Sequence, residues 1–228
     1  CSNGYTCCPS GSTCQDNGSG WGVVTTCKAE PTRTLAAASS SSSSSSLPDP
    51  DKGLGAQVCK SGGHLPASSS LKNVVIMGDS VSIGYAPFIA TALQDVALVQ
   101  HSPWGGDGGV EETEYGWRCI EYLLRAPDGT FQAPDVIWFN WGLHNDDASE
   151  GPVQTLPGQA GPSSAYAPYL DLIARRLSQL GAKTKLIFGL TSPMLCNKTT
   201  DDVVQANNVD AKAIMGKYGV GTVDMHAA

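Results

Sequence analysis

The sequence predicts an α/β domain, a doubly wound parallel sheet, preceded by a small disulfide-rich module. Short and almost continuously apolar runs recur along the second two thirds of the chain, as expected of parallel strands buried on both faces. Stretches with helical character separate these runs, and most of the cysteines lie near the N-terminus. The apolar runs are residues 74–77, 96–100, 135–141, 185–190 and 221–225.

Residues 1–28 form the predicted disulfide-rich module. Gly, Ser and Thr fill much of this stretch, so burial cannot hold it together and we expect disulfide bridges to do so. A zinc site is the weaker alternative, because the stretch has no Cys-x-x-Cys and no histidine precedes His64. Of the eight cysteines in the sequence, five lie here: Cys1, Cys7, Cys8, Cys14 and Cys27.

The same module indicates a secreted, extracellular protein, because disulfides persist in oxidising compartments. Its Cys-Cys-Pro and Trp-Gly elements resemble parts of granulin-type cysteine-rich repeats. The acceptor motifs Asn17-Gly-Ser and Asn197-Lys-Thr are compatible with a glycoprotein. The chain starts in the middle of a cysteine pattern, so we expect further residues upstream of Cys1.

Residues 29–70 are predicted to be a flexible linker. Eight consecutive serines, Ser39–Ser46, precede two prolines in a stretch that has little to bury. Such a segment would tether the module beside the main domain without fixing its position.

Residues 71–228 form the predicted α/β domain. One helix is expected to follow Ser80, and the others should lie within residues 111–126, 163–180 and 201–219. Strands and helices that alternate in this way form a parallel sheet with right-handed crossovers. Active sites of such sheets lie beyond the carboxyl ends of the strands.

Composition excludes several classes of function. The chain has 228 residues, of which 41% are hydrophobic, which is enough for one core with an appendage. Its formal net charge is −7 and no Lys/Arg cluster is present, so neither nucleic acid nor an anionic membrane is an expected partner. No run of 18 apolar residues suggests a transmembrane segment.

Ser80 is the first candidate for chemistry. It follows the first predicted strand directly, where the positive end of a helix dipole favours a nucleophilic oxygen and a developing oxyanion. A serine at this position often does no more than cap the helix. A nucleophile elbow would need glycine at Ser82, and a phosphate-binding loop would need Gly-Lys-Ser/Thr, so neither motif is present.

Polar blocks follow the first three strands in turn. They are Gly78-Asp79-Ser80-x-Ser-x-Gly, a glycine-rich turn, and Gly142-Leu-His-Asn-Asp. This order resembles the SGNH hydrolases, or GDSL esterases and lipases, from about Leu71 to the chain end. The resemblance implies a flavodoxin-like fold and no metal or organic cofactor. It also implies that Ser80 is the nucleophile and that its backbone N–H serves the oxyanion hole.

The resemblance implies two further donors to that hole. The second block offers Gly109, with Gly108 as the alternative. The third block departs from the family pattern Gly-x-Asn-Asp, because His144 stands two residues after Gly142 and Asn145 comes one later. Both side chains can donate a hydrogen bond, so either could fill the asparagine position.

The general base of the family is a histidine in a C-terminal Asp-x-x-His block. Here Asp224 and His226 are separated by one residue, and they lie at the end of the last predicted strand. We therefore expect the base beyond Ala228, with the domain truncated before it. His226 is the lesser candidate and His101, at the end of the second strand, ranks below it.

The sequence thus predicts a secreted serine ester hydrolase of the SGNH type. A small module on a serine-rich tether, with Trp21 as a sugar-stacking platform, favours a polysaccharide, and a carbohydrate acetyl ester is the first substrate class. An acyl-lipid ester is the second. The alternative from another class is a non-catalytic extracellular binding protein that retains the fold.

Overall fold

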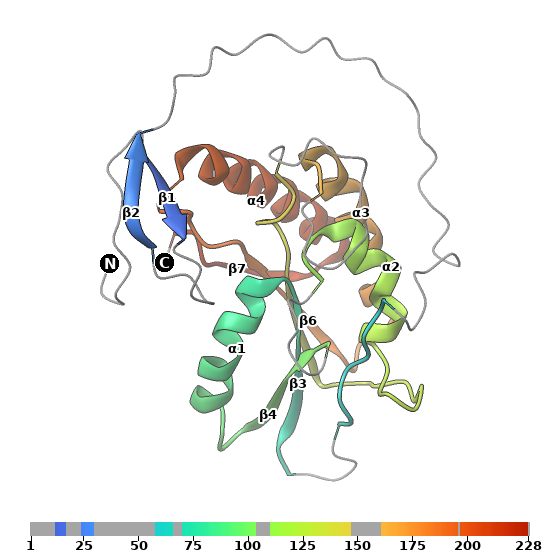
Figure 1. Cartoon of the computed structure of the whole chain (residues 1–228). Coiled ribbons are helices and arrows are strands. Elements are labelled where there is room, and N and C mark those ends of the chain that lie inside the picture. Colours follow the sequence, from blue (N-terminus) through green and yellow to red (C-terminus); the bar gives the residue numbers. More distant parts are fainter. Residues whose placement is uncertain are drawn as a thin grey trace.

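The central feature of the structure, a computed structural model, is a five-stranded parallel sheet (Figure 1). The structure describes residues 12–16, 24–29, 58–65, 70–103, 110–146, 161–195 and 197–227. The strand order is β4-β3-β5-β6-β7, which is the flavodoxin-like arrangement and confirms the predicted fold class. The strands are β3 Lys72–Gly78, β4 Ala97–Ser102, β5 Val136–Asn140, β6 Lys185–Leu190 and β7 Gly221–Asp224.

Among the described residues, four helices alternate with these strands, as the sequence predicts. Side chains at the N-cap fix three of the starts, and α4 ends at Gly219, whose φ of 67° suits glycine. Asn197 accepts from the N–H of Thr200, so α4 begins three residues before the predicted position 201. The helices are α1 Ser80–Ala92, α2 Thr113–Leu123, α3 Ser163–Ser178 and α4 Lys198–Tyr218.

The helices cover the two faces of the sheet unequally. Val75 and Met77 of β3 belong to the main core, which α2, α3 and α4 share. Val74 and Ile76 alternate with them and face the other side, where α1 lies against β3 and β4 (Figure 1). Within the part of the chain that the structure describes, no helix combines the length and apolar character needed to cross a membrane.

The N-terminal module is described only along a short hairpin. β1 Ser12–Asp16 pairs antiparallel with β2 Val24–Ala29, and Cys14 lies opposite Cys27 in the register. Cys14 and Cys27 are described only by their place in this hairpin, and the other cysteines of the module and the serine-rich part of the linker fall outside the described residues.

The end of the predicted linker is part of the folded domain. Cys59 is 2% exposed and forms a disulfide with Cys119 of α2. The N–H of Gly62 donates to the carbonyl of Arg125 at 2.9 Å, and that of Leu65 donates to Gln132 at the same distance. Residues 58–65 therefore pack on the domain, and a cysteine 60 positions away in sequence anchors them.

Candidate functional site

Two of the polar blocks meet at the centre of the sheet edge. β3 and β5 are neighbours, and Gly78 at the end of β3 pairs with Asn140 at the end of β5. β4 lies on the other side of β3, so the chain direction across the sheet reverses between β3 and β5. Parallel α/β sheets bind ligands in the crevice at such a switch point.

The turn after β3 presents Ser80 at this point. Gly78 has a φ of 152°, and a Cβ there would collide with the carbonyl oxygen of Asn140, so the turn requires glycine. Asp79 is fully buried and accepts from the N–H of Val81 at 2.9 Å, which caps α1. Burial raises the pKa of the Asp79 carboxyl to about 7.

Ser80 lies within reach of one histidine. Its Oγ is 3.1 Å from Nε2 of His144, and both side chains are half-buried. Ser80 is the first residue of α1, so its backbone N–H is among those that a helix leaves without an intrahelical partner. A hydroxyl, an imidazole nitrogen and a helix N-terminus thus converge at the switch point.

The loop that carries His144 is held from two directions. Nδ2 of Asn207 on α4 donates to the carbonyl of Gly142 at 3.0 Å and to that of Asn145 at 3.1 Å. The N–H of Gly161, just before α3, donates to the carbonyl of His144 at 2.8 Å. The backbone on both sides of the imidazole is therefore fixed by hydrogen bonds.

The side chain of Asn145 makes a different set of contacts. It is fully buried, its Oδ1 accepts from the N–H of Thr113 at 3.1 Å, and its Nδ2 donates to the carbonyl of Pro162 at 3.4 Å. Its side chain thus joins α2 to the start of α3. Of the two sequence candidates for the oxyanion position, the structure brings His144 to Ser80.

Burial and one carboxylate act on the imidazole of His144. Burial lowers the pKa of His144, while the carboxylate of Asp146 opposes this shift. Oδ1 of Asp146 is buried and has no hydrogen-bond partner among the residues that the structure describes. Burial therefore favours the neutral form of the His144 imidazole.

His101 contacts the second serine of the first block. Its Nε2 is 2.7 Å from Oγ of Ser82, which donates to the carbonyl of Asp79 at 2.6 Å. Nδ1 of His101 is 3.3 Å from the carbonyl oxygen of Pro103. Ser82 is fully buried, so this chain of contacts pins the Asp79–Ser80 turn to β4. The sequence analysis missed this role, for which the second serine of Gly-Asp-Ser-x-Ser was the available signal.

The other sequence candidates lie in separate surroundings. Nε2 of His226 is 3.0 Å from Oδ1 of Asp201 on α4, so its ring contacts that carboxylate. Gly108 and Gly109 fall outside the described residues. The N–H of Val110, the next residue, donates to the carbonyl of Gly78 at 3.0 Å. Val110 therefore lies beside the first block.

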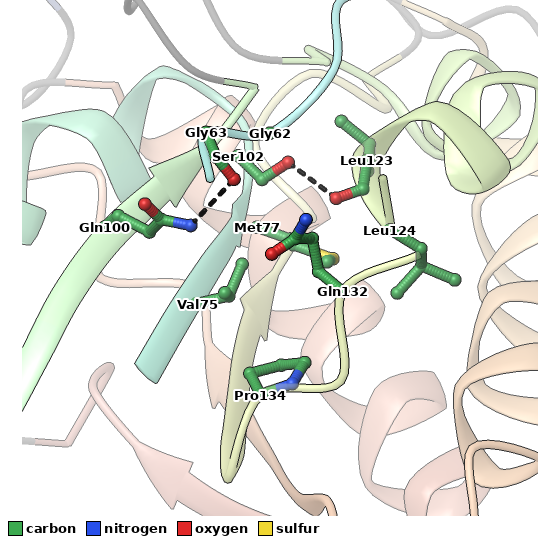
Figure 2. Close-up of a pocket in the computed structure, with 10 residues that line it drawn as sticks. All are labelled: Gly62, Gly63, Val75, Met77, Gln100, Ser102, Leu123, Leu124, Gln132 and Pro134. Carbon is green, nitrogen blue, oxygen red and sulfur yellow. Dashed lines mark hydrogen bonds between the residues drawn. The ribbon is translucent and has the colours of Figure 1, made fainter. Parts of the chain in front are cut away.

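A small hollow elsewhere in the domain does not compete with this site (Figure 2). It lies between the 58–65 segment, β3, β4 and the end of α2. Its polar side chains are engaged with backbone: Gln100 donates to the carbonyl of Gly63 at 3.3 Å, and Ser102 donates to that of Leu123 at 2.8 Å. The hollow lies where residues 58–65 pack against the domain, and we assign no ligand to it.

Comparison with known proteins found similarity at the level of structure. No family model matches the chain, and no curated protein matches it. A gut microbial diltiazem-metabolizing enzyme is similar with a TM-score of 0.49 and 14% identity over 72% of this chain, which spans 39% of that protein. An acetyl xylan esterase is similar with a TM-score of 0.49 and 12% identity. The match covers 68% of this chain and 78% of the esterase. A GDSL-like lipase from Bacteroides thetaiotaomicron is similar with a TM-score of 0.42 and 14% identity. The match covers 69% of this chain and 72% of the lipase.

Proposed function

We propose that the chain is a serine ester hydrolase in which Ser80 attacks the carbonyl carbon of an ester. The observation that carries the proposal is the 3.1 Å approach of Ser80 Oγ to His144 Nε2 at the N-terminus of α1. A nucleophilic hydroxyl and an imidazole at this distance are the core of serine-based acyl transfer. Their position at the switch point of the sheet supports a binding role for the same place.

The backbone of the first block would stabilise the oxyanion. The N–H of Ser80 is at the positive end of the α1 dipole, where a negative charge is favoured. The resemblance to the SGNH hydrolases supplies a second N–H from Gly109, with Gly108 as its alternative. His144 is within reach of two roles, as a third donor to the oxyanion or as the acceptor of the serine proton.

The substrate class we propose is a carbohydrate acetyl ester, handled outside the cell. The cysteine-rich module and the serine-rich linker support it, because a tethered module suits a polymeric substrate. The Cys59–Cys119 disulfide supports an oxidising compartment. An acyl-lipid ester is the second substrate class.

Labelling with a fluorophosphonate tests the proposal. Wild-type protein should form a covalent adduct on Ser80, and Ser80→Ala should form none. Ser164→Ala is the matched control, because Ser164 is exposed on α3 and outside the site. Absence of an adduct on wild-type Ser80 would favour the non-catalytic binding protein.

Substrate class is tested on the same proteins. Hydrolysis of acetylated xylooligosaccharides should exceed that of p-nitrophenyl octanoate, and both activities should disappear in Ser80→Ala. The reverse preference would favour the lipid ester.

A further inference from the structure

We infer that His101 is a positioning residue that sets the direction of the Ser80 backbone N–H, the first donor of the proposed oxyanion hole. In this inference, which rests on the proposed function, His101 acts through Ser82 and the carbonyl of Asp79. That carbonyl and the N–H of Ser80 belong to one trans peptide group, which is planar, so they point in opposite directions and turn together. A contact that fixes the carbonyl therefore fixes the N–H as well.

The described residues place three donors at the carbonyl of Asp79. The N–H groups of Ser82 and Ile83 donate at 3.0 and 3.3 Å, as at the first turn of any helix. The Ser82 hydroxyl donates at 2.6 Å, which is the shortest of the three bonds and the one that comes from a side chain. Because Asp79 and Ser82 are both 0% exposed, water has no access to take the place of this hydroxyl.

His101 determines where the hydrogen of that hydroxyl lies. A serine hydroxyl carries one hydrogen and a carbonyl oxygen can only accept, so the hydrogen of Ser82 lies on the bond to Asp79. Nε2 of His101 is 2.7 Å from the same Oγ and must then donate its own hydrogen to it. A bare Nε2 would instead accept the Ser82 hydrogen, and the carbonyl of Asp79 would lose its third donor. Donation therefore runs from His101 to Ser82 and from Ser82 to Asp79.

The tautomer of His101 follows from the lengths of its contacts. Burial lowers the pKa of His101, although the carbonyl of Pro103 opposes the shift, so the neutral ring with one N–H is favoured. Nδ1 lies 3.3 Å from the Pro103 carbonyl, beyond the ordinary N–H···O range, whereas the contacts at Nε2 and behind it are 2.7 and 2.6 Å. The hydrogen therefore lies on Nε2. Successive hydrogen bonds also polarise one another, which makes the Ser80 N–H a stronger donor at the far end of the series.

The sheet holds the imidazole at the level of the turn. In the register of β3 and β4, His101 lies opposite Ile76, two residues before the end of β3. Paired residues of parallel strands share a face of the sheet, and Ile76 is on the face that α1 covers. His101 therefore meets Ser82 of α1 from a strand, and a side chain on a strand is held more precisely than one on a loop.

Two substitutions separate donation from packing at this position. His101→Gln keeps an amide N–H donor near the place of Nε2, whereas His101→Leu fills similar space without a donor. With a fluorophosphonate, the maximal inactivation rate of Ser80 should fall about 10²-fold in His101→Leu, as for a catalytic group displaced by about 1 Å. The inhibitor concentration that gives the half-maximal rate should not change, because the N–H acts on the reacting oxygen. His101→Gln should retain most of the wild-type rate.

Gln100→Leu is the matched control for His101→Leu. Gln100 is the preceding residue of β4 and donates to the carbonyl of Gly63 at 3.3 Å, on the other face of the sheet, so its loss should leave the inactivation rate unchanged. A wild-type rate in His101→Leu would overturn the inference. An equal loss in His101→Gln and His101→Leu would overturn it too, because the ring would then serve only as packing.

A double-substitution cycle tests the route through Ser82. Ser82→Ala removes the hydroxyl between His101 and Asp79, so the addition of His101→Leu should lower the inactivation rate little further. Losses that multiply would show that His101 acts by another route, and they would contradict the inference.

The tautomer gives a readout that does not depend on catalysis. The ¹⁵N NMR spectrum of the wild-type imidazoles should show His101 with its hydrogen on Nε2, and the same should hold in Ser80→Ala. A hydrogen on Nδ1 would refute the direction of donation on which the inference depends. Circular dichroism of every variant at the assay temperature excludes misfolding as the cause of a lost rate.

Failure of the inference is distinguishable from failure of the proposed function. If the fluorophosphonate labels Ser80 equally fast in the wild type and in His101→Leu, the function stands and the positioning role falls. If wild-type Ser80 is not labelled, the proposed function falls and the positioning role falls with it, whichever tautomer the spectrum shows.

Discussion

Asn207 on α4 is predicted to position the loop that carries His144 in the proposed site, without contacting Ser80 itself. Its Nδ2 donates to the carbonyls of Gly142 and Asn145, at 3.0 and 3.1 Å, and the side chain is 3% exposed. Asn207→Ala removes both donors and leaves two buried carbonyls without their partner. The loop that holds His144 opposite Ser80 should therefore shift or loosen.

The expected magnitudes follow from these two bonds. Loss of the partner of a buried polar group costs about 1–3 kcal/mol, so the two carbonyls together should lower the free energy of unfolding of Asn207→Ala by about 2–6 kcal/mol. For a domain of this size the melting temperature should fall by about 4–24 °C. A displacement of the loop by about 1 Å should lower kcat/KM by about 10²-fold.

Asn208 provides a matched control for Asn207. It is the next residue, is 5% exposed, and also makes two hydrogen bonds, but to the N–H and carbonyl of Thr191 after β6. Asn208→Ala should lose comparable stability and retain far more activity, measured by urea denaturation and by kcat/KM on p-nitrophenyl acetate. Equal losses of rate in the two variants, or a wild-type rate in Asn207→Ala, would refute the reasoning.

Three further predictions concern stability. Gly78→Ala should lower the free energy of unfolding by more than about 3 kcal/mol, or prevent folding. Gly84→Ala should be neutral or stabilising, because Gly84 lies in α1 with open space around it. Chemical denaturation of both variants compares the two effects. Removal of the Cys59–Cys119 disulfide, which joins cysteines 60 residues apart, should lower stability by about 4 kcal/mol, measured with and without reductant. Burial raises the pKa of Glu112 from 4.5 to about 7, so the folded state keeps a proton that the unfolded chain loses, and stability should fall as pH rises across this interval. Glu112→Gln should flatten that dependence, and an equally steep curve in the variant would contradict it.

The fold was predictable because each strand carries its own signal. The apolar runs around Ile76 and Phe139 are buried on both faces, which makes them continuous in sequence and easy to place. The anchored segment 58–65 was not predictable, because its composition is that of a linker and its attachment depends on Cys119, which is remote in sequence. A disulfide partner is set by tertiary proximity, and cysteine spacing does not reveal it.

The position of Ser80 at the sheet edge was predictable for a similar local reason. Glycine, a capping acid and a serine follow one strand directly, and topology places the end of that strand at the centre of the sheet edge. The contact between His101 and Ser82 was harder to foresee. It joins the ends of two strands, and the register that brings them level emerges only when the sheet is assembled.

The choice between His144 and Asn145 shows where the sequence stops being informative. Both residues have polar side chains that can donate, and they stand at consecutive positions of one loop, where their side chains take different directions. The buried pocket formed by the N–H of Thr113 and the carbonyl of Pro162 accommodates an amide, which presents an acceptor and a donor together. Once Asn145 occupies that pocket, the preceding side chain is the one that reaches Ser80. The contacts that Asn145 makes with α2 and the start of α3 thus leave His144 as the residue that lies opposite Ser80.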